Sequence, residues 1–312
     1  MPEINALTTS VLLNVWQGDQ SYAISRSIRS VINQSMQPSE LVVVIDGPLD
    51  VDKLVLIHTE LRTARFPYKI VELEERHGLS LARNIGFSVA QGQLVIVHDA
   101  DDVMHVDRLR RQVEVFCRTG SSVIACQAFE FESGTELIDR IRTTPSDPSA
   151  LRRSLLRNNS ITHSSVLIRR RLFEEVGGYN KVTGMEDYEL WLRLIQGGIS
   201  ITVMGEVLQA ISRDPEYLTR RQGLRFLSSE IQILRRINAV PSTFRYLRNF
   251  LSVASRMALR LAPSRLMARS YNRLSIRQSV APKFSLHNFS EFSWTWEKGQ
   301  LHSSRSEATR HF

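Results

Sequence analysis

The chain has 312 residues, of which 42% are hydrophobic and 23% are charged, and its formal net charge is +8. This composition is that of a globular protein with a sizeable core, which excludes a disordered or fibrous chain. Cys117 and Cys126 are the only cysteines and match no zinc spacing, so we expect free thiols in a reducing compartment. No run of about 18 apolar residues predicts a membrane-spanning helix, and Met1 to Ser10 lack the features of a signal peptide.

The first third of the chain alternates between short apolar runs and amphipathic segments. We expect strands at 10–16, 41–45, 68–73 and 94–97 and helices at 22–34 and 79–90. This alternation predicts an α/β fold with a mostly parallel central sheet flanked by helices. Beyond it, strands are expected at 122–131, 165–168 and 199–203, helices at 106–116 and 187–195, and a Pro/Ser/Asp loop at 143–149.

The last third of the chain has a different character. Helical patterns cover 222–237 and about 243–261, and the residues after Pro282 show no clear period. We therefore predict an α/β domain over 1–215, a basic helical extension over 216–280 and an irregular tail over 281–312. Fourteen arginines and only three acidic residues lie between Arg213 and Arg277. This amphipathic, basic region favours contact with anionic membrane lipid, while a helix packed on the domain and nucleic-acid binding are the alternatives.

Three carboxylates follow the apolar run that ends at His98. Asp99, Asp101 and Asp102 stand where a buried parallel strand leaves the sheet, the place where α/β sheets bind ligands. Clustered carboxylates suit hard cations such as Mg²⁺ or Mn²⁺, which commonly bind one or two carboxylates together with substrate phosphates. The pattern predicts a metal-dependent site for a nucleotide diphosphate. The structural alternative is a polar turn in which Asp caps the next helix. We expect His98 to be a packing histidine and not a ligand.

Further motifs surround this acidic strand end. Asp46 closes the second strand, in the run Ile45-Asp46-Gly47-Pro48. The segment 76–86, which begins Arg76-His77-Gly78, leads into the helix before the acidic strand. Gly177-Gly178-Tyr179 is followed by the segment 185–191, Met-Glu-Asp-Tyr-Glu-Leu-Trp.

In this order, the pieces resemble the GT-A glycosyltransferases of family 2, and the second strand resembles the subset that builds bacterial exopolysaccharides. The resemblance is strong over about 11–211 and weaker to about 277. It implies a Rossmann-like nucleotide-diphospho-sugar transferase fold with a C-terminal helical extension. It also implies an inverting transfer of sugar from a nucleotide-diphosphate donor to a glycan or lipid-linked oligosaccharide acceptor, in the cytoplasm or at the inner face of the cell membrane.

The resemblance assigns a role to each motif. Asp46 and Arg76 contact the nucleotide base, and Asp99 and Asp101 hold the ribose, the diphosphate and the metal, Mg²⁺ or Mn²⁺, with Asp102 in the metal shell. Glu186 and Asp187 form the catalytic pair, with Asp187 as the base. The side chains assigned to the acceptor are Trp191 and His163.

Several points stay open at this stage. The turn after the first strand, 14–19, departs from the usual family pattern, which leaves the nucleotide undetermined. Gly177-Gly178 also fits a helix C-cap, and His163 also fits a hydrogen-bonded structural histidine. The competing functions are a catalytically degenerate GT-A-like binding subunit, a nucleotidyltransferase and a nucleic-acid-binding protein. Asp101 and Asp187 argue against the first, and the absence of a Gly-rich phosphate loop near the N-terminus argues against the second.

Overall fold

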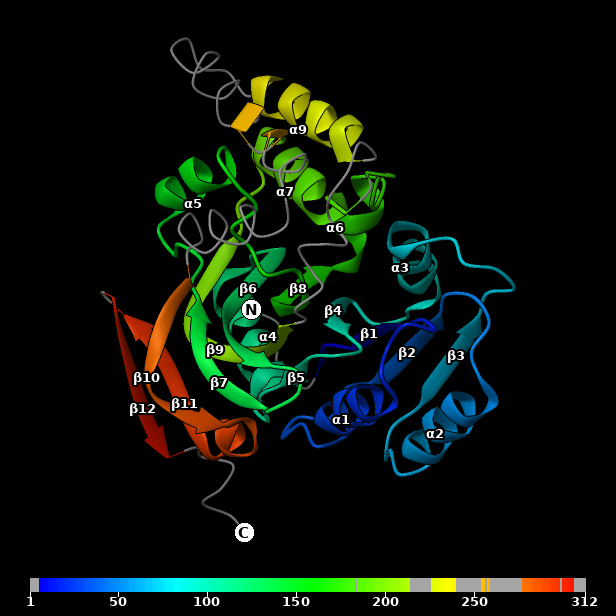
Figure 1. Ribbon diagram of the computed structural model, residues 1–312. Coiled ribbons are helices and arrows are strands. Elements are labelled where there is room, and N and C mark those ends of the chain that lie inside the picture. The colour runs from blue at the N-terminus through cyan, green and yellow to red at the C-terminus, as the bar shows by residue number, and fades with distance from the viewer. Residues whose placement is uncertain are drawn as a thin grey trace.

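The computed structural model describes residues 6–182, 184–213, 226–239, 254–255, 257–258, 277–297 and 299–305. In these ranges, one mixed sheet of twelve strands forms the centre of the molecule, with helices packed on both of its faces (Figure 1). The strand order along the main path is β12-β11-β9-β6-β8-β4-β1-β2-β3. The expected α/β architecture is confirmed.

The N-terminal half of the sheet is parallel. It contains β1 (Thr9–Val15), β2 (Glu40–Ile45), β3 (Tyr68–Glu72) and β4 (Leu94–Asp99), with β1 between β2 and β4. The crossovers are α1 (Ser21–Ile32), α2 (Val51–Leu61) and α3 (Leu79–Val89). The strands and the helices α1 and α3 match the expected ranges, whereas α2 was not predicted. Because these strands run in parallel, their carboxyl ends meet at one edge of the sheet.

Alternation along the strands divides the core into two layers. Val11 and Leu13 of β1 pack in the layer that α1, α2 and α4 (Arg108–Thr119) cover. Leu12 of β1 points to the opposite layer, which holds α3 and helices from later in the chain. The strands are buried on both faces, which explains why they are continuous apolar runs.

The second half of the chain adds mixed pairings. Its further elements are β5 (Val103–Met104), β6 (Val123–Glu132), β7 (Leu137–Arg142), α5 (Pro148–Leu155), η2 (His163–Ser165), β8 (Val166–Arg169), α6 (Arg170–Glu175), α7 (Glu186–Gln196) and β9 (Thr202–Arg213). β8 lies antiparallel between β4 and β6, whereas β6 and β9 are parallel. The helices α5, α6 and α7 lie on the same side of the sheet as α3 (Figure 1).

The C-terminal region agrees only in part with the expectation. A helix, α9 (Leu227–Ala239), packs against α7 and confirms the first helix of the extension. The second expected helix, at 243–261, and most of the basic region lie outside the described residues. The expectation of an irregular tail is wrong, because the residues from 277 onward form β10 (Arg277–Ser285), η4 (Leu286–Glu291), β11 (Phe292–Glu297) and β12 (Gln300–Arg305).

These tail strands gain their stability from distant partners. β10 pairs with β7, and β11 meets β9 at Thr295 and Glu206. Phe289 and Trp294 pack edge-on against Phe129 of β6 in a small third core. Across the ranges that the structure describes, we find no helix with the length and apolar content to cross a membrane.

Candidate active site

The acidic segment lies at the carboxyl edge of the parallel strands, as predicted. Asp99 is the last residue of β4 and stands in register with Asn14 of β1. The Asp102 amide donates to the Asp99 carbonyl at 3.2 Å and closes a tight turn. Burial, together with the charges of Asp102, Asp99 and Asp19, raises the pKa of Asp101 well above its ordinary value. The turn therefore concentrates negative charge at one point of the edge.

Asp19 belongs to this cluster and was not singled out from the sequence. It follows β1, and its carboxylate accepts a hydrogen bond from the Trp16 amide at 2.9 Å. Burial raises the pKa of Asp19 to about 6, and the Trp16 hydrogen bond opposes this rise while Asp99 adds to it. Asp46 was predicted because it is an acid just past a parallel strand. The same reasoning applies to Asp19.

Asp102 is held by the protein and not presented to solvent. One of its oxygens accepts from the Gln209 amide at 3.2 Å and from the Ser164 hydroxyl, and the other accepts from the Ser212 amide at 3.0 Å. Burial raises the pKa of Asp102 to about 7, and Asp99 adds to this, while the three hydrogen bonds oppose it. Because both oxygens are engaged, Asp102 fits a supporting role better than the predicted place in the metal shell.

A buried cation lies behind Asp102. Arg108 is fully buried and donates to Gln209 Oε1 at 2.6 Å, and Gln209 in turn donates to Asp102. His98 is buried in the same layer, 3.4 Å from Ser30 Oγ. Burial, together with the charge of Arg108, lowers the pKa of His98 to about 3, so this imidazole is neutral. The structure is consistent with the predicted packing role of His98.

Asp101 is the carboxylate that best fits a divalent cation. In the described part of the chain, no three His, Cys, Asp or Glu side chains converge to hold a metal by themselves. Mg²⁺ and Mn²⁺ sites of this kind take one or two carboxylates and complete their shell with water and substrate phosphates. Asp101 is only half-buried, and the charge of its neighbours favours a cation beside it. The residues present therefore fit such an ion once a diphosphate is bound.

A buried arginine connects the acidic turn with α7. Arg83 of α3 is only 2% exposed, and its guanidinium lies 2.6 Å from Asp99 Oδ1 and 3.8 Å from Glu186 Oε1. Burial disfavours the charge of Arg83, but the carboxylates of Asp99 and Glu186 outweigh burial and raise its pKa. The geometry joins two sequence motifs more than 80 residues apart, and no periodicity in the sequence indicates that contact.

The residues expected to contact the base lie together at the ends of β1 and β2. Asp46 is buried, and its carboxylate accepts from the amides of His77 at 2.8 Å and Gly78 at 3.0 Å. Arg76, which is exposed, stacks on the indole of Trp16 with its guanidinium carbon 3.8 Å from the ring centroid. Asp46 thus holds the 76–78 loop, and Trp16 with Arg76 forms a flat, partly exposed surface beside it.

Asp187 lies in the first turn of α7 and remains partly exposed. Its Oδ2 accepts from the side-chain amide of Asn159 at 2.7 Å, and its Oδ1 accepts from the backbone amide of Tyr188 at 2.8 Å. Glu186, the preceding residue, is 7% exposed and turns toward Arg83. The acidic pair predicted from the sequence therefore divides into a buried residue, Glu186, and an accessible one, Asp187.

The Gly-Gly-Tyr motif is fastened to α3 by one asparagine. Asn84 donates to the Tyr179 carbonyl at 2.9 Å and accepts from the Tyr179 amide at 2.9 Å. Gly177 and Gly178 have φ of 77° and 67° and close the C-terminus of α6, which confirms the predicted helix cap. The Tyr179 hydroxyl lies 2.7 Å from Nε2 of His163.

His163 and Trp191 lie deeper than the acceptor role requires. Burial and the charge of Arg83 hold the pKa of His163 well below its usual range, so the imidazole is neutral, and Tyr179 occupies its Nε2. Trp191 has no exposed surface and packs in the core layer that α3 and α7 share. The prediction that Trp191 contacts the acceptor does not fit this burial, because its side chain supports His163 from within the core.

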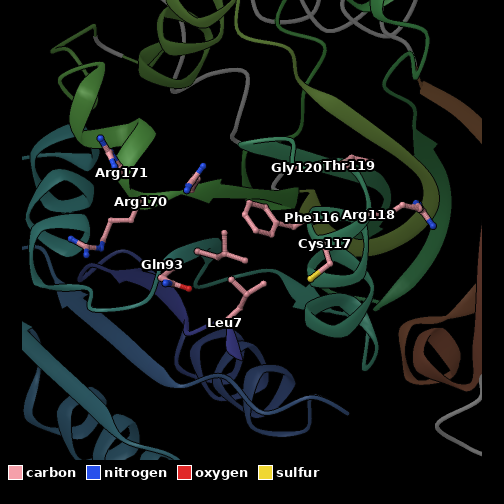
Figure 2. Close-up of a pocket in the computed structure, with 11 residues that line it drawn as sticks. Leu7, Gln93, Phe116, Cys117, Arg118, Thr119, Gly120, Arg170 and Arg171 are labelled. Carbon is pink, nitrogen blue, oxygen red and sulfur yellow. The ribbon is translucent and has the colours of Figure 1, made fainter. Parts of the chain in front are cut away.

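A cavity of about 650 Å³ opens at the opposite edge of the sheet (Figure 2). Leu94, at the start of β4, and Phe116 and Cys117, near the end of α4, line it together with arginines such as Arg118 and Arg169. Asp99 lies at the far end of β4, so this cavity is separate from the acidic turn. Both cysteines are free thiols, as expected, with Cys126 buried and Cys117 half-buried.

The mixed sheet, with the acidic turn at the carboxyl edge of its parallel strands, has the GT-A architecture. The molecule superposes with a TM-score of 0.59 on Staphylococcus aureus TarS 1–349 in complex with UDP-GlcNAc, at 16% identity over 81% of this chain and 72% of that one. The mannosyltransferase PcManGT from Pyrobaculum calidifontis, in complex with GDP-Man and Mn²⁺, also gives a TM-score of 0.59, at 16% identity over 86% of this chain and 76% of that one. These likenesses confirm the GT-A fold.

The sequence comparisons specify the family. The model of glycosyl transferase family 2 matches residues 21–177, so the chain belongs to that family and is a glycosyltransferase. It is 25% identical to the amylovoran biosynthesis glycosyltransferase AmsE of Erwinia amylovora, over 85% of this chain and 98% of that protein. It is 26% identical to the UDP-Gal:alpha-D-GlcNAc-diphosphoundecaprenol beta-1,3-galactosyltransferase of Escherichia coli, over 85% of this chain and 95% of that protein.

Proposed function

We propose that this chain is an inverting glycosyltransferase that moves a sugar from a nucleotide-diphosphate donor to an acceptor hydroxyl. The observation that carries the proposal is the position of Arg83, which pairs with Asp99 at 2.6 Å and reaches Glu186 at 3.8 Å. This buried cation sets the acidic turn, suited to a diphosphate, at a fixed distance from the start of α7. Asp187 is therefore held beside the donor edge of the sheet.

In the proposed reaction, the acceptor oxygen attacks the anomeric carbon of the donor sugar from the side opposite the diphosphate. The new carbon–oxygen bond forms as the bond to the diphosphate breaks, and Asp187 takes the hydroxyl proton. One such displacement inverts the anomeric configuration. Asp187 suits the task because it is partly exposed and its two hydrogen bonds leave lone pairs free on both oxygens. A positioned base of this kind contributes roughly 10²–10⁴-fold.

The donor end of the site is assigned to the acidic turn. Asp101 would hold a divalent cation, Mg²⁺ or Mn²⁺, which supplies positive charge against the charge that develops on the diphosphate. Asp99, anchored by Arg83, would contact the ribose. Asp46 fixes the 76–78 loop, and the face made by Arg76 and Trp16 offers a surface against which a base can stack.

The acceptor is proposed to be a lipid-linked oligosaccharide in bacterial cell-surface polysaccharide synthesis. The support is the similarity to the E. coli enzyme, whose name specifies a diphosphoundecaprenol-linked sugar, and to the amylovoran enzyme. The arginine-rich region 216–280 is the proposed contact with the inner face of the cell membrane, since Arg attracts anionic headgroups. Flotation with anionic and with neutral vesicles tests this contact, and equal recovery of the protein in both soluble fractions would contradict it.

The experiment that tests the enzymatic proposal separates donor binding from transfer. Purified full-length protein is screened by thermal shift with UDP-, GDP- and dTDP-sugars, with and without Mn²⁺ or Mg²⁺. The Asp187→Asn variant should retain the donor-dependent shift and lose transfer by roughly 10²–10⁴-fold. The Asp101→Asn variant should lose the metal-dependent part of the shift. Asp52→Asn, an exposed change in the first turn of α2, controls for the loss of one charge.

Two outcomes would contradict the proposal. Near-parental transfer by Asp187→Asn would remove this residue as the base. A complete lack of donor-dependent shifts in the parent protein would favour the degenerate binding subunit, in which the fold is kept and the reaction is lost.

A further inference from the structure

Asn159 makes the one side-chain hydrogen bond that the described residues donate to Asp187. Its Nδ2 lies 2.7 Å from Asp187 Oδ2, across 28 positions in the sequence. Nothing in the sequence motifs indicates this contact, because Asn159 lies in the segment between α5 and η2, far from the family signatures. We propose that Asn159 is a positioning residue that orients the Asp187 carboxylate for proton transfer, an inference that rests on the function proposed above.

The backbone around Asn159 is fixed at several points. Its carbonyl accepts from the Arg142 guanidinium of β7 at 3.1 Å, and the carbonyl of the next residue, Ser160, accepts from the Thr144 hydroxyl at 2.8 Å. On the other side, the Asn158 amide donates to the Ser154 carbonyl at 3.0 Å, at the end of α5. The backbone on both sides of Asn159 is therefore held by hydrogen bonds, as a preorganised contact between its side-chain amide and Asp187 requires.

The chemistry of the group that donates a hydrogen bond to Asp187 matters as much as its position. Asp99 pairs with a cation, Arg83, whereas Asp187 accepts from a neutral carboxamide. A cation in direct contact would reduce the proton affinity of the carboxylate more than a neutral donor does. An amide fixes the rotamer of the carboxylate without placing a positive charge beside it. The two carboxylates therefore have hydrogen-bond partners of different charge.

Other charged and titratable groups also face this part of the site. Glu186 precedes Asp187 on α7, and Arg83 approaches it from α3. Burial raises the pKa of Tyr179, in the loop before α7, and the charge of Asp187 adds to this rise while Arg83 opposes it. His163, on η2, is held neutral, and Arg142 contacts the Asn159 backbone from β7. None of these groups changes in the variants below, so their effects cancel in the comparison.

The informative variant is Asn159→Asp, which keeps the shape of the side chain and replaces the amide hydrogen-bond donor by a negatively charged carboxylate. Repulsion between the two carboxylates should move the acid limb of the pH dependence of kcat/KM to higher pH by one unit or more. Asn159→Ala removes the hydrogen-bond donor without adding charge. It should lower kcat about 10- to 100-fold, with little change in the KM for the nucleotide-sugar donor. Asn159→Ser serves in its place if the alanine variant does not fold.

The matched control is the neighbouring asparagine. The side-chain oxygen of Asn158 accepts from the Ser154 hydroxyl at 3.2 Å, and among the described residues of α7 it has no hydrogen-bond partner. Asn158→Asp and Asn158→Ala repeat both changes one position away and should keep the parental kcat and pH profile. Donor-dependent thermal shifts measured on all variants report that the fold and the donor site are intact.

The outcomes separate this inference from the proposed function. Parental kcat and pH profile in the Asn159 variants, with Asp187→Asn inactive, would overturn the positioning role and leave the function in place. An equal pH shift in Asn158→Asp would overturn it too, because the effect would then be one of general charge. Near-parental transfer by Asp187→Asn would overturn the proposed base and the inference together.

Discussion

The guanidinium of Arg83 lies 2.6 Å from the carboxylate of Asp99, and this buried ion pair joins α3 to the carboxyl end of β4. Arg83 is almost completely buried, whereas the Asp99 side chain keeps 32% of its exposure. The pair therefore anchors one end of the acidic turn and leaves the carboxylate accessible from outside. Glu186, on the far side of Arg83, extends the connection to α7.

Replacing Arg83 by methionine should destabilise the protein. Removing one partner of a buried pair leaves the other charge without compensation and typically costs about 3–5 kcal/mol. The partial exposure of Asp99 lets water compensate in part, so we expect the lower end of that range. Urea unfolding of Arg83→Met and of Arg83→Met/Asp99→Asn measures the effect. The double variant should recover part of the loss, and additive losses would contradict a direct coupling between the two residues.

The two glycines before Tyr179 allow a matched comparison. Both have positive φ, 77° at Gly177 and 67° at Gly178, which costs an L-residue about 1–2 kcal/mol. A Cβ on Gly177 would meet nothing within 4 Å, whereas one on Gly178 would lie 2.7 Å from Asn84 Oδ1. Gly178→Ala should therefore lower the unfolding free energy more than Gly177→Ala, and it should also reduce transfer because Asn84 holds Tyr179.

The control in this comparison is Gly177→Ala itself, since it carries the same backbone strain without the collision. Thermal unfolding and transfer rate are measured on both variants. Equal losses in the two would mean that Asn84 moves aside freely and that its two hydrogen bonds to Tyr179 do not fix the loop.

The fold was predictable wherever its signal is local. Continuous apolar strands and amphipathic helices can be read from one segment at a time, and each of the four parallel strands was found in this way. The tail was not predicted because the β11–β12 hairpin packs against Phe129 of β6 and meets β9, both far back in the chain. Its alternation of Phe292, Trp294 and Trp296 with Ser293 and Thr295 is nevertheless a strand pattern that the sequence offered.

The candidate site was also predictable only where its signal is local. The acids at the ends of strands were predictable, because a parallel sheet gathers the carboxyl ends of its strands. Their orientation was not, since Asp102 accepts hydrogen bonds from Ser164 of η2 and from Gln209 and Ser212 of β9, all far along the chain. The role of Asn159 could not be predicted for a related reason. It is a loop residue outside any sequence motif, and its contact with Asp187 exists only in the fold.

The burial of Trp191 predicts a stability effect and not an acceptor effect. Trp191→Ala should cost about 3–5 kcal/mol in unfolding free energy, as expected for a large aromatic removed from a core. Trp191→Phe should fold and keep the parental KM for the acceptor. Chemical denaturation and steady-state kinetics distinguish the two roles. A large rise in acceptor KM for Trp191→Phe, with unchanged stability, would restore the acceptor assignment made from the sequence.

We expect Asp102, in the acidic turn, to make a contribution to stability that depends on pH. Burial, with the charge of Asp99, raises the pKa of Asp102 from 3.8 to about 7 in the folded protein. At this site the folded state therefore binds more protons than the unfolded state between about pH 4 and 7, so the contribution of Asp102 to stability falls as pH rises through this window. At most, the effect of this one group is on the order of 4 kcal/mol. Asp19, whose pKa burial raises to about 6, acts in the same direction.

Urea unfolding from pH 5 to 7.5 in EDTA measures this slope. Buried neutral histidines such as His98, where burial lowers the pKa to about 3, act in the opposite direction below about pH 6.5, so the contribution of Asp102 is read from the difference between parent and variant. Asp102→Asn removes one titrating group, so the stability of the parent relative to this variant should fall as pH rises from 5 to 7.5, whereas Asp52→Asn should show the parental slope. Mn²⁺ should restore stability near pH 7, because a cation favours the ionised carboxylates that the fold otherwise disfavours. Identical slopes for Asp102→Asn and the parent would show that Asp102 is already ionised in the folded protein, held so by its three hydrogen-bond donors.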